Sequence, residues 1–131
     1  MELPRLLLYN IEESKKFNIE KLCKRMKIEV RNIKEVEYGF TLGYLCGLEK
    51  QQEEQKAIGN IDKEMMIISG FSDTLLDEFL KEYRDAGIAQ ISIKAVLTKH
   101  NQKWTSTELF KELSKEHEYF IQKNKEKNKD A

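Results

Sequence analysis

The stretch EMMIISGFSDTLLDEFLKEYRDAGI, residues 64–88, contains the elements of one complete strand and helix. Residues 64–71 are mostly apolar, which predicts a buried strand. Ser72 stands where a helix N-cap is expected, and Gly87 occupies the position after a helix where a left-handed residue is usually required. Between them, apolar side chains at helical spacing predict one buried helix face, formed by Leu75, Leu76, Phe79, Leu80 and Tyr83.

The same plan occurs sixty residues earlier in the chain. Residues 5–11 predict a strand, residues 28–33 predict another, and the interval from Asn10 to Ile28 equals that from Gly70 to Ile88. Residues 88–97 predict the last strand of the second half. A strand, helix, strand unit of this length closes with parallel strands and a right-handed crossover. The helix of the first half shows its apolar face at Ile19, Leu22, Cys23 and Met26.

Two such units in one chain predict an α+β fold with pseudo-twofold halves. We expect a two-layer, ferredoxin-like βαββαβ sandwich with a short helix after the second strand and a C-terminal helix. The first strands show little polar alternation, which leaves open an α/β fold whose parallel sheet carries helices on both faces. We expect one domain over residues 1–121, with a polar insert loop at 49–63, and a flexible charged tail at 122–131.

A capping signal predicts where the C-terminal helix begins. Thr105 and Glu108 form a T-x-x-E capping box, and Trp104 and Leu109 have the spacing of a hydrophobic staple. The first half carries an equivalent aromatic–threonine pair at residues 40–41. We therefore expect Trp104 to serve the fold at least as much as any ligand.

Glycine occupies every fourth position between residues 38 and 48. An interior helical glycine is about 1 kcal/mol less favourable than alanine, so local propensity does not account for Gly43. We expect another group to approach the backbone closely there, and the same chain, a dimer partner or a ligand could supply it. Gly47 is expected to end the short helix.

The charges of the chain balance overall but are unevenly distributed. Lys and Arg number 23, as do Asp and Glu, so net charge does not favour a nucleic-acid partner. Residues 15–34 nevertheless carry eight basic side chains against two acidic ones, and residues 73–85 carry two basic against five acidic. The helix of the first half is thus expected to be basic, and the helix at residues 73–85 is expected to be acidic.

The sequence contains no motif that predicts catalysis or a cofactor. No nucleophile elbow, P-loop or dinucleotide fingerprint is present, and we expect no catalytic residue and no cofactor. Metal binding would depend on Cys23, Cys46, His100 and His117, which lack short ligand spacings, so we expect no metal site. The two cysteines without CxxC spacing indicate a reduced, cytoplasmic compartment. No apolar run approaches the roughly 20 residues of a membrane span.

Five segments, taken in order, resemble the bacterial domain of unknown function 3783 family. The resemblance extends over residues 6–117. It implies a small cytoplasmic bacterial protein and brings no established activity, cofactor or catalytic residue. The segments are LLLYN at residues 6–10, EYGFTLGYLCGL at 37–48, MMIISGFS at 65–72, KAVLTKHNQKW at 94–104 and ELFKEL at 108–113.

We therefore expect a non-enzymatic binding or regulatory module, with a homodimer left open. Its surface should lie where the segments that follow the second strand of each half meet. Aromatic rings would supply contact area, Gly43 would permit close approach, and Lys94 with Asn101 would orient a polar or anionic group. Two alternatives stay open: an enzyme or sensor for a small anionic metabolite anchored by Lys94, and nucleic-acid binding through the basic first helix. The expected surface comprises Tyr38, Gly39, Gly43, Tyr44, Lys94, Thr98, Asn101 and Trp104.

Overall fold

The computed structural model of the chain describes residues 3–49 and 60–115. Its described part contains a four-stranded sheet with the order β2-β1-β3-β4. The two halves meet at the centre, because β1 and β3 are neighbours, and β2 and β4 form the two edges. The strands are β1 (Arg5–Tyr9), β2 (Glu29–Asn32), β3 (Met65–Ser69) and β4 (Ile93–Val96).

Strand direction separates the two halves of the sheet. β1 runs parallel to β2, β3 runs parallel to β4, and the central β1–β3 pair is antiparallel. Leu7 pairs with Ile67, and the flanking pairs are Leu6 with Ile68 and Leu8 with Met66. This register relates the halves by a pseudo-twofold axis through the central pair and confirms the predicted doubling.

The expectation of a two-layer, ferredoxin-like order was wrong. In that plan each βαβ unit is split, whereas here the two strands of each unit are direct neighbours. The alternative, helices on both faces, gives the correct layers, but its parallel sheet was also wrong because the central pair is antiparallel. The reason is visible in β1 and β3: residues 6–9 and 65–69 are buried on both faces and need cover from two sides.

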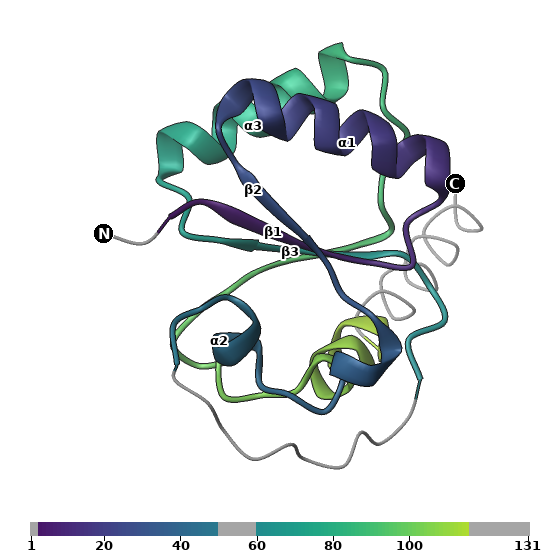
Figure 1. Cartoon of the computed structure of the whole chain (residues 1–131), viewed down its shortest axis with the longest axis vertical. Helices are drawn as coiled ribbons and strands as arrows, with labels where there is room; N and C mark the ends of the chain where they lie inside the picture. The colour runs from purple at the N-terminus through teal and green to yellow at the C-terminus, as the bar shows by residue number, and fades with distance from the viewer. Residues whose placement is uncertain (1–2, 50–59, 116–131) are drawn as a thin grey trace, which may run out of the picture.

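Helices cover both faces of the sheet (Figure 1). α1 (Glu13–Met26) and α3 (Asp73–Asp85) lie on one face, and α2 (Leu42–Leu45) lies on the other with a C-terminal helix described at residues 106–115. A 3-10 turn, η1 (Glu35–Glu37), precedes α2. The expected short helix after the second strand and the expected C-terminal helix are both present.

Side chains of alternating strand positions enter two separate cores. Leu6 and Leu8 pack with α1 and α3, whereas Leu7 and Tyr9 pack with α2 and the C-terminal helix. Successive strand residues point to opposite faces, so the continuous apolar run of β1 supplies both cores.

The helix ends follow the predicted capping chemistry. The Ser72 hydroxyl accepts a hydrogen bond from the Leu75 N–H (3.1 Å) at the start of α3, and Gly87 has φ +71° after its end. Thr105 accepts from the Glu108 N–H (3.3 Å), and its own N–H donates to the Glu108 carboxylate (3.4 Å). Both bonds of the predicted capping box are therefore formed.

The last strand is shorter than the sequence predicts. β4 begins at Ile93 rather than at Ile88, although Ile88 and Ile91 are both buried. The corresponding connection in the first half leads from Ile28 directly into β2 at Glu29. The second half thus has a longer passage from its helix to its edge strand.

Candidate binding surfaces

The predicted meeting of the two halves occurs at an antiparallel bridge between Thr41 and Thr105. The Leu42 N–H donates to the Trp104 carbonyl and the Gly43 N–H to the Gln102 carbonyl, both at 2.8 Å. Segments sixty residues apart in the chain are thereby held side by side on the face that α2 and the C-terminal helix cover.

An aromatic pair lies on each side of this bridge. The rings of Phe40 and Tyr44 stack at 4.9 Å, and the rings of His100 and Trp104 meet edge to face at 5.3 Å. Phe40, Tyr44 and Trp104 are half-buried and His100 is exposed. We call these four residues the seam surface.

The close approach expected at Gly43 is made by the same chain. A Cβ on Gly43 would lie 2.8 Å from the Cδ of Glu49. That carboxylate accepts from the Thr41 hydroxyl (3.1 Å) and the Gln102 side-chain amide (3.4 Å). Gly43 thus makes room for an acidic side chain that ties the two halves together.

Two predicted polar residues hydrogen-bond to each other within a turn, in which Asn101 is buried and Thr98 is exposed. The Thr98 N–H donates to the Asn101 side-chain oxygen (2.8 Å), and the Asn101 N–H donates to the Thr98 hydroxyl (3.1 Å). The Asn101 amide also donates to the Val96 carbonyl (3.2 Å). In the first half, the Lys34 N–H donates to the Glu37 carboxylate (3.2 Å) in the same way, so this turn belongs to the repeated fold.

Tyr38 and Gly39 are buried beneath the seam surface. The Tyr38 ring lies 5.9 Å from that of Tyr9, within the core on this face of the sheet. Burial raises the pKa of Tyr38, so its hydroxyl stays protonated at neutral pH. Tyr38 therefore belongs to the core against which Phe40, Tyr44 and Trp104 pack.

Lys94 lies apart from the other predicted site residues. It is exposed and donates to the Gln90 side-chain oxygen (2.9 Å). Its strand partner Met66 belongs to the core under α1 and α3, which places Lys94 on the opposite face of the sheet from the seam surface. The structure therefore brings together the aromatic and glycine residues and separates Lys94 from them.

A cavity of about 190 Å³ opens beside Lys94 between α3 and β4. Sequence reasoning assigned no role to Arg84 or Gln90, which line it with Lys94. We call this cavity the basic pocket, and the side chains of its rim and floor are Phe79, Leu80, Tyr83, Arg84, Gln90 and Lys94.

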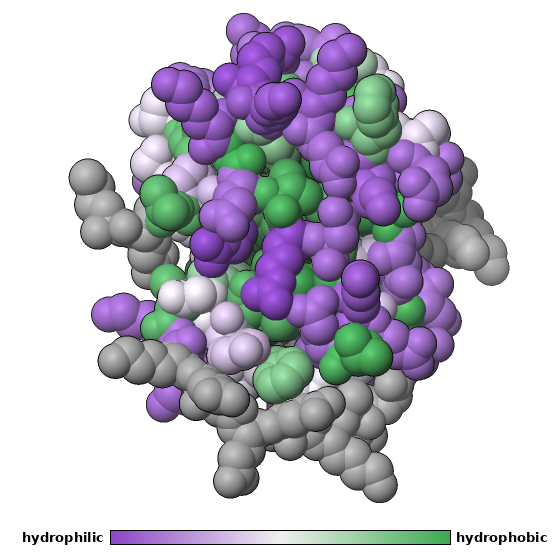
Figure 2. All heavy atoms as spheres, viewed as in Figure 1, coloured by the Kyte–Doolittle hydropathy of each residue, from purple (hydrophilic) through white to green (hydrophobic). Residues whose placement is uncertain are grey.

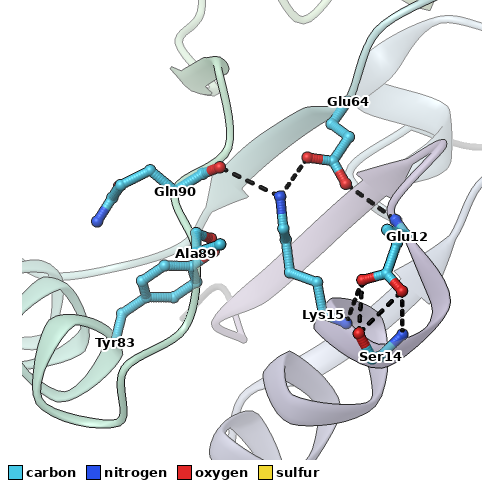
Figure 3. Close-up of polar contacts among 7 residues, drawn as sticks. All are labelled: Glu12, Ser14, Lys15, Glu64, Tyr83, Ala89 and Gln90. Atoms are coloured by element: carbon cyan, nitrogen blue, oxygen red, sulfur yellow. Dashed lines mark hydrogen bonds and ion pairs between the residues drawn. The ribbon is translucent and has the colours of Figure 1, made fainter.

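A polar network next to this pocket links α1 to the second half (Figure 3). The Lys15 ammonium group forms an ion pair with Glu64 and donates to the Gln90 carbonyl (3.2 Å). Glu64 also accepts from the Glu12 N–H (2.9 Å), at the start of α1. The side chains of Lys15 and Glu64 are 13% and 22% exposed, so this pair is largely shielded from solvent.

Tyr83 is a neutral part of the same region. Its hydroxyl donates to the Ala89 carbonyl (2.6 Å), as Figure 3 shows, and its side chain is buried. Burial, with a smaller contribution from Glu64, raises the pKa of Tyr83 to about 12. It therefore contributes a ring and an occupied donor at neutral pH, and no anion.

The basic first helix packs beside the acidic third helix. Arg25 forms an ion pair with Glu82 across α1 and α3 at 2.8 Å, and Lys15 is occupied by Glu64. Figure 2 shows mostly hydrophilic side chains over α1. Part of the positive charge available to attract a nucleic acid is thus balanced within the protein. An exposed ion pair such as that of Arg25 and Glu82 adds at most about 1 kcal/mol to stability.

The two cysteines are buried, and no disulfide joins them. Burial raises the pKa of the Cys23 thiol to about 12, so it is protonated at neutral pH. Across residues 3–49 and 60–115, no three His, Cys, Asp or Glu side chains gather where they could share a metal ion. His117 lies outside the described residues.

The fold and these surfaces define an α+β domain built from two βαβ halves, with helices on both faces of a mixed sheet. Residues 64–120 match the family model for the domain of unknown function DUF3783, which confirms the predicted resemblance over this part of the chain. The matched part begins immediately before β3 and includes α3, β4 and the described C-terminal helix. The first half repeats its architecture outside the match.

Neither curated proteins nor solved structures gave a match to the chain. None of the helices in the described part of the chain is long and apolar enough to cross a membrane.

Proposed function

We propose that this chain is a non-enzymatic protein-binding module and that the seam surface binds a second copy of the chain. The observation that carries the proposal is the Thr41–Thr105 bridge, which sets one aromatic pair on each side of a pseudo-twofold seam. Aromatic rings are enriched in the buried centres of protein interfaces. Three of the rings here are half-buried and that of His100 is exposed, and each ring contacts its partner ring.

A second copy is the partner that this arrangement favours. A closed dimer requires a patch that matches itself after a twofold rotation. The seam surface carries aromatic groups on both sides of an internal pseudo-twofold axis, so two copies can face each other with rings opposite rings. The result would be four βαβ units in an arrangement of approximate 222 symmetry.

The polar groups near the seam support binding more than catalysis. Asn101 is engaged in its turn, the Glu49 carboxylate accepts from Thr41 and Gln102, and Lys94 is on the other face of the sheet. What the seam surface offers outward is ring area and one imidazole. Contact area with little free polar chemistry suits a protein partner.

Sedimentation velocity of the full chain, from about 1 to 100 μM, tests the proposal over the concentration range of ordinary protein dimers. We expect a mass approaching twice 15.5 kDa at high concentration. Tyr44→Glu and His100→Glu should each weaken the dimer at least about tenfold, because each introduces a buried charge at the contact. Phe17→Glu is the matched control, since Phe17 is 64% exposed on α1, on the opposite face.

A chain that stays monomeric throughout this range overturns the proposal. A dimer that tolerates both seam variants but is broken by Phe17→Glu would place the interface on α1. Circular dichroism of each variant shows whether the fold is kept.

A further inference from the structure

Lys94 occupies a strand position where the first half of the protein has an apolar residue. Leu6 of β1 pairs with Val30 of β2, and Met66 of β3 pairs with Lys94 of β4. Leu6 and Met66 are equivalent under the pseudo-twofold axis, so Val30 and Lys94 are equivalent as well. Val30 packs against the core under α1 and α3, whereas Lys94 is exposed on that same sheet face.

The longer connection before β4 accompanies this substitution. Residues 89–92 have no counterpart between Ile28 and β2 in the first half. They supply Gln90, whose side chain receives a hydrogen bond from Lys94 and which lines the basic pocket. The second half therefore departs from the repeat in two places that meet at one cavity.

The rim of the basic pocket is positively charged. Arg84 and Lys94 both line it, and no acidic side chain does so among the described residues. Glu64, the carboxylate of the neighbouring network, is neutralised by its ion pair with Lys15. Tyr83 keeps its proton. An anion at the rim would meet two cations and no competing negative charge.

The floor of the basic pocket is apolar and firmly packed. Phe79 is fully buried, and its ring meets Phe71 edge to face at 5.6 Å and Tyr83 at 5.9 Å. Leu80 stands at the rim and is 41% exposed. An apolar tail would cover Leu80, the apolar side chain of the pocket with accessible surface, above the packed rings.

We propose that the basic pocket binds a small amphiphilic anion, with a carboxylate or phosphate head held by Arg84 and Lys94 and a short apolar tail over Phe79 and Leu80. The cavity of 190 Å³ is below the roughly 300 Å³ at which drug-sized sites begin. At about 30 Å³ for each water-sized group, it accommodates about six such groups, which is a tail of up to about six carbons with the head outside at the rim. The site lies across the sheet from the seam surface, so the anion-binding proposal does not depend on the proposed dimer.

The test is an NMR titration of the full-length ¹⁵N-labelled chain at low salt with four probes: hexanoate, hexyl phosphate, acetate and hexylammonium. We expect saturable shifts of amides in residues 80–94 with hexanoate or hexyl phosphate, and the tighter of the two identifies the head group. Acetate tests the head without the tail, and hexylammonium tests the tail with the opposite charge; both should bind at least about tenfold more weakly. No saturable shift with either anion, or equal binding of hexylammonium, overturns the proposal.

Three variants separate this site from general attraction to positive charge. Lys94→Gln should weaken anion binding about three- to fivefold, the range of an exposed ion pair. Leu80→Asn should weaken the binding of hexanoate but leave the binding of acetate unchanged. Lys81→Gln is the control, because Lys81 is an exposed residue of α3 that does not line the pocket. All three side chains are exposed, so the fold should be retained, and an equal loss with Lys81→Gln would overturn the proposal.

Discussion

The hydroxyl pair of Tyr9 and Ser106 provides a quantitative test of how the two halves are joined. Tyr9 ends β1 in the first half, and Ser106 opens the C-terminal helix in the second. Both residues are 0% exposed, and their hydroxyl oxygens are 2.6 Å apart. Burial raises the pKa of Tyr9 above its ordinary value of 10.0, so the pair is neutral at pH 7.

Removing either hydroxyl leaves the other buried without this partner. Such an orphaned group costs about 1–3 kcal/mol, so Tyr9→Phe and Ser106→Ala should each lower the free energy of unfolding by about that amount. The double variant leaves no orphaned hydroxyl. We expect its loss to be well below the sum of the single losses, with a coupling energy of about 1 kcal/mol or more.

Urea denaturation at pH 7 measures these values, with the fluorescence of the single tryptophan, Trp104, and circular dichroism as independent probes. With a slope of about 1.5 kcal/mol/M, a loss of 1.5 kcal/mol moves the midpoint by about 1 M. Strictly additive losses in the double variant would show that the two hydroxyls do not stabilise one another. Losses below about 0.5 kcal/mol in both single variants would show that water replaces the missing partner. The conclusion that the remaining hydroxyl is left buried without a partner would then be wrong.

Two further predictions concern a buried thiol and two glycines. Burial raises the pKa of Cys23 from 9.0 to about 12, so the folded state keeps a proton that the unfolded state loses. The contribution of this thiol to stability is therefore constant below about pH 8 and is lost as pH rises from about 9 toward 12. Cys23→Ala should make this fall shallower between pH 9 and 10, by up to about 1.4 kcal/mol per pH unit in urea titrations; an unchanged slope would contradict the assignment. Gly47 and Gly87 have φ of +75° and +71°, but an added Cβ would lie 2.7 Å from the Arg5 guanidinium only at Gly47. Alanine should cost about 1 kcal/mol at Gly87 and measurably more at Gly47, and equal thermal shifts would show that the Arg5 side chain moves aside freely.

The elements that were predicted well are those decided by local chemistry. Ser72, Gly87 and the Thr105–Glu108 box each act within a few residues. Helical spacing identified the buried faces of α1 and α3, except that Leu80 was wrongly placed on the buried face and is 41% exposed. The start of β4 was misplaced because Ile88 and Ile91 are buried without being paired in the sheet. Apolar periodicity reports burial, and hydrogen bonding between strands is a separate matter.

The pattern of apolar residues in the sequence does not determine the order of the strands. A split and an unsplit pair of βαβ units place the same residues in the same elements and bury the same apolar faces. The one informative signal was the lack of polar alternation in the first strands, which kept helices on both faces open as an alternative. It did not decide between the two layer arrangements, and it carried no information on the antiparallel direction of the central pair.

The two segments that the repeat predicted to meet do lie side by side, but not all the residues predicted to share one surface lie together. Equal spacing brought residues 40–44 beside residues 100–105, as expected from the doubled plan. Asn101 was expected to face a ligand, yet its side chain closes the turn with Thr98. Lys94 alternates with Ile93 and Ala95 on β4, so the two-residue period of a strand already separated it from the seam.

The doubled architecture offers a more direct way to find functional residues in this chain than composition does. Positions that agree between the halves, such as the turn bonds at Lys34 and Thr98, are required by a fold that occurs twice. At positions where the two halves differ, the shared fold does not require the residue found in at least one of the halves. A lysine where the repeat has Val30 gives up apolar burial on a sheet face that helices cover, at a cost of order 1 kcal/mol or more. Because that loss accompanies an extended connection and a cationic cavity, the simplest physical account is a gain elsewhere, which anion binding at Lys94 would supply.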